Sequence, residues 1–367
     1  MELGYLPHTE SISNDELVAC FNAYVDQFND QNAEAITSGL VEALSHSNSA
    51  FIEKASGIKS RYVMAKKDIL NVDVMRPTFV ERPNDSISMQ AEIGVTAAKK
   101  ALLAANKTPA DIDLIIVACA YTQRSYPAMA IEIQNELGCG GWAFDMLVAC
   151  SAATFGIINA ANAVRSGTAK TVLVINPEIL SPQINYRDRD SHFIFGDVAT
   201  ASVIEDESTA NSDHVLKIIA EQPITQFSNN IRSNIGYMNA CSPENIHNVD
   251  KYFIQQGRKV FKEVLPMVSS LIAEQMEKVN LAPQDIKRLY LHQANINMNS
   301  FIAKKVMGRI PSIEEAPIIL DEYANTSSAG CIIALNKHHQ DLVKGDKMVL
   351  CSFGAGYSAC CLIFEHL

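Results

Sequence analysis

The sequence contains no apolar stretch that approaches the roughly 20 residues needed to cross a bilayer as a helix. Basic residues are also scarce, since 30 Lys and Arg face 41 Asp and Glu and the formal net charge is −11 at pH 7. General nucleic-acid binding is therefore not expected, because a phosphate backbone needs clustered basic side chains. An acidic protein partner could still dock on a small local basic patch. The first residues, Met1–Tyr5, lack the basic and apolar regions of a signal peptide, so no membrane association is expected.

The nine cysteines include no Cys-x-x-Cys pair, which argues against a zinc site or a thioredoxin-like motif. Most of them lie in apolar runs, as Cys119, Cys351 and Cys360 do, and are expected to be buried reduced thiols. We therefore predict no bound metal and a location in the reducing cytoplasm.

Three features occur twice and in the same order, which suggests that the chain consists of two related halves. Their spacing is far above the 20–50 residues of a solenoid repeat. We predict an N-terminal half, residues 1–208, and a C-terminal half, residues 209–367. The matched pairs are Pro109–Ile112 and Pro283–Ile286, Gly167–Lys170 and Gly345–Lys347, and Phe195-Gly196 and Phe353-Gly354.

Short apolar runs alternate with helical segments in each half, which indicates mostly parallel sheets covered by helices. The segment Ala149–Val164 is apolar nearly all round, so we place it between two layers at the centre of an α/β/α/β/α body. The other expected helices are Ala91–Ala105, Val260–Val279 and Phe301–Met307, and the expected strands include Leu114–Ala118 and Thr171–Ile175.

Cys150 stands at the start of this central helix. A thiol there faces unpaired backbone N–H groups and the positive end of the helix dipole, so we expect a pKa below the usual value near 8.5. Taken alone, a buried structural cysteine is the commoner interpretation.

Two polar side chains and a turn mark the C-terminal half. His292 ends the apolar run Leu289–Leu291, where α/β proteins place ligand sites, although a core histidine would fit the same pattern. Asn325 lies in a small, polar segment and is otherwise expected as a helix N-cap. The turn Phe353–Gly356 lets the backbone approach a ligand closely and offers N–H groups for an oxyanion hole.

Jointly and in this order, these segments resemble the β-ketoacyl-acyl-carrier-protein synthase III family of condensing enzymes. The resemblance extends from about Gly57 to the C-terminus and implies the duplicated, five-layer thiolase fold with mixed sheets. The segments that carry it are Phe144–Cys150, Phe195–Asp197, His292–Asn295, Asn325–Ala329 and Phe353–Gly356.

The resemblance implies a role for each residue of the site. Cys150 would take an acyl group from an acyl-CoA primer. His292 and Asn325 would hold the malonyl thioester and stabilise the enolate that remains when carbon dioxide leaves, a task that needs donors aimed at the developing charge. The backbone N–H groups of Cys150 and Ala355 would form the oxyanion hole, and Phe353 would lie beside the catalytic pair.

The resemblance also implies contacts with substrates and partners. Arg189 and Phe51 would enclose the adenine of CoA, which is a substrate group and not a cofactor, and Asn295 would contact the pantetheine arm. Tyr126 would reach across a homodimer interface into the partner's acyl pocket. Lys262, Lys304 and Lys305 would dock the acidic acyl carrier protein, although a solvated helix face explains these lysines equally well.

Four positions depart from the family pattern, and all of them concern the substrate more than the chemistry. Ala153 replaces a larger aromatic beside the nucleophile and is expected to enlarge the acyl pocket, whereas the bulk of Tyr126 opposes this. The other three are Asn297 for a carrier-docking arginine, Ala355 for a glycine and Ala55 for an arginine near the CoA mouth.

Three alternatives accompany this interpretation. The order Cys150, His292, Asn325 is also that of papain-like hydrolases, but the flanking motif of that family is missing. A starter-specific acyltransferase of a secondary-metabolite pathway would share the fold and the three residues. A non-enzymatic relative is the third alternative, which the complete set of residues disfavours.

Overall fold

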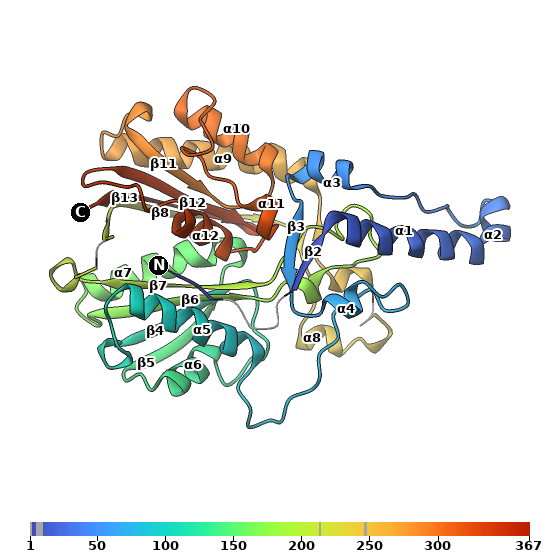
Figure 1. Cartoon of the computed structure of the whole chain (residues 1–367), viewed down its shortest axis with the longest axis horizontal. Helices are drawn as coiled ribbons and strands as arrows, with labels where there is room; N and C mark the ends of the chain where they lie inside the picture. The colour runs from blue at the N-terminus through green and yellow to red at the C-terminus, as the bar shows by residue number, and fades with distance from the viewer. Residues whose placement is uncertain (1, 5–9, 213, 246–247) are drawn as a thin grey trace.

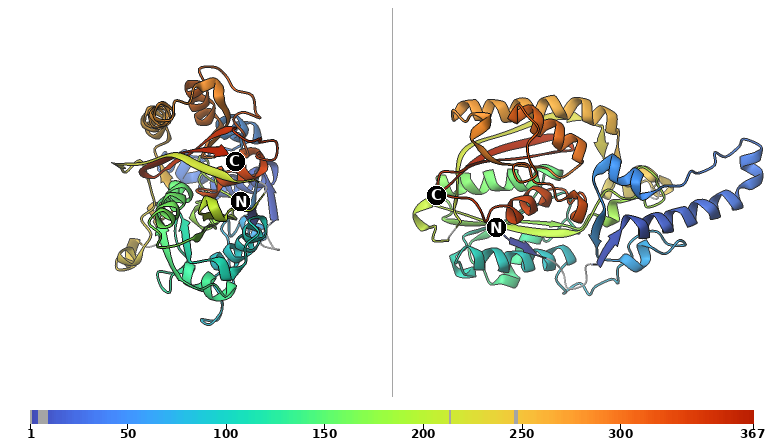
Figure 2. Two further views of the ribbon diagram at one scale, coloured as in Figure 1. Left: turned by 90° about the vertical axis from the view of Figure 1, so that its left-hand side faces the viewer. Right: turned by 45° about the horizontal axis from the view of Figure 1, so that its top comes forward.

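Two β-sheets lie one above the other, with helices between them and on both outer faces (Figures 1 and 2). The structure, a computed structural model, describes residues 2–4, 10–212, 214–245 and 248–367. From one outer face to the other, Figure 1 shows helices, a sheet, the central helices α7 and α12, the second sheet and further helices. The predicted five-layer α/β/α/β/α arrangement with mixed sheets is confirmed, whereas the mostly parallel sheets expected from the apolar runs are not observed. No helix in the described part of the chain is both long enough and apolar enough to cross a membrane.

The first sheet has the strand order β1-β7-β6-β4-β5. Strand β4 is parallel to β5 and β6, and β7 is antiparallel to β6 and β1. Helices α5 (Met89–Ala104) and α6 (Met129–Leu137) cover its outer face. The strands are β1 (Glu2–Gly4), β4 (Leu114–Cys119), β5 (Trp142–Leu147), β6 (Thr171–Glu178) and β7 (Val198–Glu205).

The second sheet has the order β11-β12-β13-β8, with β11 parallel to β12 and the other neighbours antiparallel. Helices α9 (Gly257–Lys278) and α10 (Ile296–Met307) cover its outer face. The strands are β8 (Leu216–Ser228), β11 (Ile286–Leu291), β12 (Lys347–Gly354) and β13 (Gly356–His366). The three repeated sequence features precede β4, β6 and β7 in one sheet and β11, β12 and β13 in the other. The predicted boundary at residues 208 and 209 falls between β7 and β8.

The central layer consists of α7 (Ala152–Arg165) and α12 (Ala329–Lys337), and both helices contact strands of both sheets. This explains why the sequence of α7 is apolar nearly all round. An added Cβ at Gly156 would lie 2.8 Å from Val174 and 3.0 Å from Ala118, so glycine allows α7 to approach the first sheet closely. The predicted helix began three residues earlier, but Ala149–Ser151 form a separate 3₁₀ turn.

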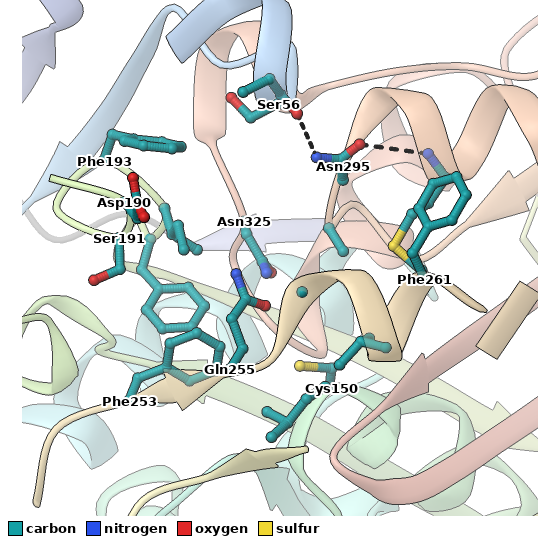
Figure 3. A pocket seen from close by; sticks show the side chains of 18 of the residues that line it. Ser56, Cys150, Asp190, Ser191, Phe193, Phe253, Gln255, Phe261, Asn295 and Asn325 are labelled. Carbon is teal, nitrogen blue, oxygen red and sulfur yellow. Dashed lines mark hydrogen bonds between the residues drawn. The ribbon is translucent and has the colours of Figure 1, made fainter. Parts of the chain in front are cut away.

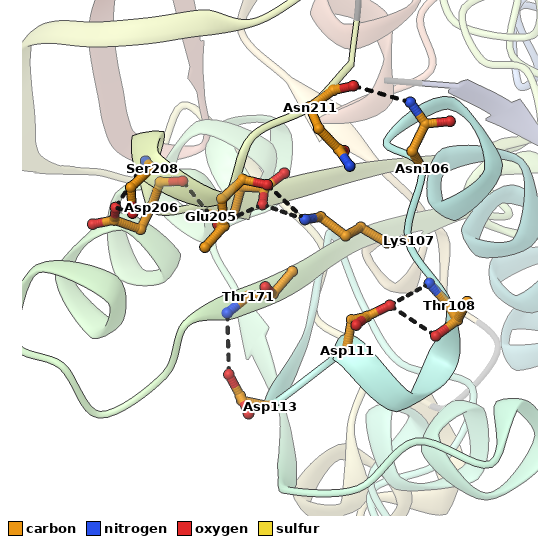
Figure 4. A network of polar contacts seen from close by, with 11 residues as sticks. Asn106, Lys107, Thr108, Asp111, Asp113, Thr171, Glu205, Asp206, Ser208 and Asn211 are labelled. Atoms are coloured by element: carbon orange, nitrogen blue, oxygen red, sulfur yellow. Dashed lines mark hydrogen bonds and ion pairs between the residues drawn. The ribbon is translucent and has the colours of Figure 1, made fainter.

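The 3₁₀ turn Pro109–Asp111 belongs to a polar network at the start of the first-half strands (Figure 4). The Asp111 carboxylate accepts hydrogen bonds from the N–H and hydroxyl of Thr108, each of 2.7 Å. Asp113, just before β4, accepts from the backbone N–H of Thr171, at the start of β6, at 3.1 Å. Asp113, which follows the Pro-x-Asp-Ile motif directly, therefore links the start of β4 to the start of its neighbour β6.

The remaining predicted helices appear with shifted ends. Ala91–Ala105 corresponds to α5, and Val260–Val279 corresponds to α9. The helix predicted at Phe301–Met307 starts earlier, at Ile296, because the side chain of Asn295 accepts hydrogen bonds from Asn297 and Met298 and caps it.

An N-terminal arm, residues 14–48, projects beyond the two sheets (Figure 1). Its long helix α1 (Asn14–Gln31) is followed by α2 (Ala33–Thr37) and a return segment that runs back along α1. Asn22 and Asn29 each exchange two hydrogen bonds with the backbone of this segment, at Ser47 and Leu44. Shorter elements complete the fold: β2 (Glu10–Ser13), α3 (Ser49–Ser56), β3 (Ser60–Val63), α4 (Lys66–Ile69), β9 (Ile231–Arg232), α8 (Tyr237–Ala240), β10 (Ile254–Gln255) and α11 (Leu320–Tyr323).

Candidate active site

A cavity of 520 Å³ leads from the surface beside α3 to the N-terminal ends of the central helices (Figure 3). Cys150, His292 and Asn325 all line it, although they lie far apart in the sequence and come from both halves. The expected convergence of the three side chains is therefore observed. Phe353 and Gly354 line the cavity beside them, as the motif Phe353–Gly356 suggested.

Cys150 lies in the turn Ala149–Ser151, between strand β5 and helix α7. Ala149 has a left-handed φ of 45°, which is uncommon for a residue with a side chain and marks a sharp change of chain direction. The hydroxyl of Ser151 donates a 2.9 Å hydrogen bond to the backbone oxygen of Ser358 on β13. The turn that carries Cys150 is thus fastened to the second half of the molecule.

Gly354 packs directly against Cys150. A Cβ built on Gly354 would lie 2.7 Å from the Cβ of Cys150 and 3.1 Å from its backbone nitrogen. Carbon atoms in contact prefer about 3.5–4.0 Å, so only glycine fits without displacing the cysteine. Ala355 follows in the turn between β12 and β13, next to the cavity but not in its lining.

The expectation of a lowered Cys150 pKa is wrong for this structure. Burial raises the pKa of the thiol to about 11, and the negative charge of Glu178 acts in the same direction. The nearby Ser327 side chain opposes the shift but is outweighed. Burial destabilises the thiolate more than the backbone N–H groups of the short turn before α7 stabilise it. The resting residue is therefore a thiol.

His292 follows strand β11 directly and is almost fully buried. Its backbone N–H donates to the oxygen of Cys351 at 2.9 Å, and its ring meets Phe353 edge to face with centroids 5.3 Å apart. Burial lowers the pKa of the imidazole to about 4, although the backbone of Ser327 opposes this. His292 is therefore neutral near pH 7, and its Nδ1 has no hydrogen-bond partner among the described residues.

Asn325 is held by the first half of the molecule. Its N–H donates to Ile194 at 3.0 Å, and its backbone oxygen accepts from Gly196 at 3.2 Å. The side-chain oxygen accepts from the N–H of Ser327 at 2.9 Å. This bond orients the amide, and the NH₂ group, which has no partner among the described residues, remains as a donor toward the cavity. The backbone bonds to Ile194 and Gly196 explain the position of the Phe195–Asp197 motif.

Arg189 and Phe51 do not leave a gap for a base in this structure. The guanidinium lies directly over the Phe51 ring, 4.4 Å from its centroid, and its Nε donates to the backbone oxygen of His46 at 2.8 Å. A base between them would need about 7 Å, or two van der Waals contacts. Phe51 lines the cavity, whereas Arg189 does not.

Asn295 lines the cavity, but protein groups already use both ends of its side chain. Its NH₂ donates to the backbone oxygen of Ala55 at 2.6 Å, and its oxygen caps α10 (Figure 3). Asn297 also points its amide toward Ala55, at 3.3 Å. These bonds fasten α10 to α3 at the cavity wall, so a pantetheine contact by Asn295 would be additional to a structural role.

The other predicted residues lie away from the cavity lining. Tyr126 is 78% exposed in the loop before α6. Ala153 is fully buried among apolar residues of the central helices and does not face the cavity, so the structure does not support an enlarged pocket at this position. Lys262, on α9, and Lys304 and Lys305, on α10, are exposed.

Three contributors were missed from the sequence. Arg258 supplies a basic side chain to the lining at the start of α9, and the spacing of Arg258, Lys259 and Lys262 was a usable signal. Phe253 lines the cavity and packs edge to face on Phe195, with ring centroids 4.7 Å apart, and no sequence pattern marks it. Glu178 is buried close to Cys150, hidden within the apolar strand β6.

Comparisons with known proteins agree with this geometry. A family model described as 3-oxoacyl-[acyl-carrier-protein (ACP)] synthase III matches residues 144–221, and its C-terminal counterpart matches residues 276–366. A beta-ketodecanoyl-[acyl-carrier-protein] synthase of Pseudomonas aeruginosa is 53% identical over 92% of this chain and 97% of its own. A beta-ketoacyl-[acyl-carrier-protein] synthase III of Agrobacterium fabrum is 30% identical over 88% and 92%. The crystal structure of 3-oxoacyl-[acyl-carrier-protein] synthase III from Aquifex aeolicus superposes with a TM-score of 0.75 and 25% identity, covering 99% and 98%.

Proposed function

Because the chain belongs to the 3-oxoacyl-[acyl-carrier-protein] synthase III family, we propose that Cys150, His292 and Asn325 carry out a decarboxylative condensation that yields a 3-oxoacyl carrier protein. The convergence of these three side chains at the end of one cavity is the observation that supports the proposal. Family membership also excludes the papain-like hydrolase. The enzyme is thus an acyltransferase that initiates fatty acid synthesis.

In the first half-reaction, the sulfur of Cys150 attacks the carbonyl carbon of an acyl-CoA. The carbon–sulfur bond to CoA breaks, and the proton of the thiol leaves with the CoA sulfur. Because the Cys150 pKa is raised to about 11, this proton must move during the reaction, and the neutral imidazole of His292 is available to accept it. Backbone N–H groups of Cys150 and Ala355 would stabilise the tetrahedral oxyanion.

In the second half-reaction, a malonyl thioester replaces CoA in the cavity. Its carbon–carbon bond to the carboxylate breaks, carbon dioxide leaves, and the electron pair forms an enolate on the thioester. The neutral His292 and the free NH₂ group of Asn325 can donate to that oxygen. The α-carbon then attacks the Cys150 thioester carbonyl, the carbon–sulfur bond breaks, and the released sulfur takes up a proton from solvent to restore the thiol.

The acyl group is proposed from the Pseudomonas relative. Its name states a beta-ketodecanoyl product, which has ten carbons, and a decarboxylated malonyl unit contributes two of them. The corresponding primer has eight carbons. We expect intact-protein mass spectrometry with acyl-CoAs of graded length to show fastest labelling of Cys150 by the eight-carbon thioester. Faster labelling by acetyl-CoA would refute this length, and a preference for an unrelated starter group would favour the starter-specific alternative.

Variants of the three residues test the mechanism. Cys150→Ala should show no mass increase with any acyl-CoA, because it lacks the sulfur. Asn325→Ala should still acquire the acyl group, and His292→Ala should acquire it more slowly because the proton acceptor is lost. Both variants should release little carbon dioxide from the malonyl donor. Normal carbon dioxide release by both variants would contradict the assignment of the enolate site.

A homodimer is proposed from strand β5. This strand is at the edge of the first sheet and exposes Trp142, Phe144 and Leu147. An edge with unpaired backbone groups and apolar side chains is suited to pairing with a second copy. Such a pair would bring the Tyr126 loops toward the partner's cavity.

Sedimentation velocity of Trp142→Glu tests this proposal. The variant should dissociate, whereas Leu40→Glu, an exposed apolar position in the arm, should not. A wild-type monomer, or a Trp142→Glu variant that remains dimeric, would refute it.

A further inference from the structure

Glu178 is a fully buried carboxyl group that the proposed chemistry does not use. It ends strand β6 in the first half of the molecule. Carboxylates are rarely buried unless several donors satisfy their oxygens, so its hydrogen bonds show what it holds in place.

The donors to Glu178 come from both halves. Its Oε2 accepts from the backbone N–H of Ala120, which follows β4, at 3.2 Å. Its Oε1 accepts from the backbone N–H of Ser328 at 3.2 Å and from the Ser328 hydroxyl. Ser328 is the N-cap residue of α12, yet its side chain does not cap the helix. The hydroxyl bonds Glu178 instead.

Ser328 closes the short segment Asn325–Ser328, which carries the enolate-binding amide. The front of this segment is held by the Ile194–Gly196 backbone, and its rear is held by Glu178. Ser327 has a left-handed φ of 51° and Ala324, just before the segment, has a φ of 56°. Such backbone conformations cost about 1–3 kcal/mol each and persist only where the surroundings hold them.

We propose that Glu178 is a positioning residue for the malonyl half-reaction: its carboxyl group anchors Ser328 and thereby fixes the direction of the Asn325 amide. This inference rests on the proposed function. The link acts through Ser327, whose N–H holds the Asn325 side-chain oxygen at 2.9 Å. Glu178 also lies near Cys150, where its charge raises the pKa of the thiol, so the anchor sits beside the reacting atoms.

The test compares the two half-reactions in Glu178→Gln. Glutamine keeps one acceptor oxygen, but its NH₂ group faces either the Ala120 N–H or the Ser328 N–H and hydroxyl. The hydrogen bonds on that side are lost, because an NH₂ group cannot accept them. Cys150 acylation, measured by intact mass, should stay within about threefold of wild type. Carbon dioxide release from the malonyl donor should fall by about 10- to 100-fold, the loss expected for a displacement of the order of 1 Å.

Ser328→Ala provides a second variant that keeps the fold of β6 intact. It removes only the hydroxyl donor and should reduce carbon dioxide release several-fold. In the double variant Glu178→Gln/Ser328→Ala, the fold-losses in carbon dioxide release should not multiply. Both substitutions break the same hydrogen-bonded link between Glu178 and Ser328. Multiplying losses would show that the two residues act independently and would overturn the inference.

Asn176→Ala is the matched control. Asn176 is buried on the same face of β6, two residues before Glu178, and donates to Ala118 at 2.7 Å, and no hydrogen bond among the described residues joins its side chain to Asn325–Ser328. It should reduce stability but leave the ratio of decarboxylation to acylation unchanged. An equal selective loss in Asn176→Ala, or an unselective loss in Glu178→Gln, would overturn the role of Glu178. A wild-type protein that releases no carbon dioxide would instead overturn the proposed function itself.

Discussion

The close contact between Gly354 and Cys150 allows a quantitative prediction for Gly354→Ala. The added Cβ would lie 2.7 Å from the Cys150 Cβ, about 1 Å inside an ordinary carbon–carbon contact. Cys150 has little room to retreat, because Ser151 is bonded to Ser358 and Ala152 is fully buried behind it. The variant should therefore be less stable by about 1–3 kcal/mol, the usual cost of overpacking.

The effect on the chemistry should exceed the effect on stability. A nucleophile displaced by about 1 Å can lose on the order of 100-fold in rate, so acylation of Cys150 should fall by that factor. The assay is the time course of mass increase with an acyl-CoA, together with thermal unfolding.

Gly140→Ala is the control for Gly354→Ala, because no atom of the described residues beyond its chain neighbours lies within 4 Å of the added Cβ, and it should acylate at the wild-type rate. Wild-type acylation by Gly354→Ala, with an unchanged melting temperature, would refute the argument that a rigid contact places the nucleophile.

Three further predictions concern charge. Alkylation of Cys150 by iodoacetamide should rise about tenfold per pH unit toward a pKa of about 11, and a plateau below pH 8.5 would contradict the burial argument. Burial also lowers the pKa of His192 and His292 to about 4, below the ordinary value near 6.5. The buried neutral imidazoles therefore add to the stability of the fold above pH 6.5, and this contribution is lost as the pH falls toward 4. The free energy of unfolding, measured in urea, should be lower at pH 4.5 than at pH 7 by up to about 3 kcal/mol per histidine. Equal free energies of unfolding at the two pH values would contradict the lowered histidine pKa values. Replacing Lys304 and Lys305 by Glu should raise the KM for a malonyl carrier protein several-fold and leave the KM for malonyl-CoA unchanged, because the proposed docking on this face concerns the carrier alone. An equal rise in the KM for the malonyl carrier protein and in the KM for malonyl-CoA would exclude carrier docking on this face.

Much of the fold could be predicted from short segments of the sequence. The all-apolar helix could be placed centrally because a helix without a polar face has to be covered on every side. His292 could be selected because it stands where an apolar strand ends, which is where α/β sheets open toward ligands. Cys150 could be selected because it stands at the start of the apolar central helix. The family pattern then joined them with Asn325, and the described structure places all three on one cavity.

The environment of the same residues could not be predicted in this way. The Cys150 pKa was expected to fall because the sequence shows a helix start, but the shift depends on how much protein surrounds the sulfur. Arg189 and Phe51 were matched to a nucleotide site, yet the return segment of the arm holds the guanidinium on the ring. Ala153 was assigned to an acyl pocket and instead lies in the core.

By itself, the sequence determined which chemistry this protein can carry, because residue types and strand ends are properties of short segments. Only the tertiary structure decided how that chemistry is tuned. Glu178 and Ser328 are 150 positions apart, and no local pattern links a buried carboxyl group on one strand to a serine in the other half. Burial, hydrogen bonding and close contacts such as that of Gly354 with Cys150 depend on atoms that the fold brings together from distant parts of the chain.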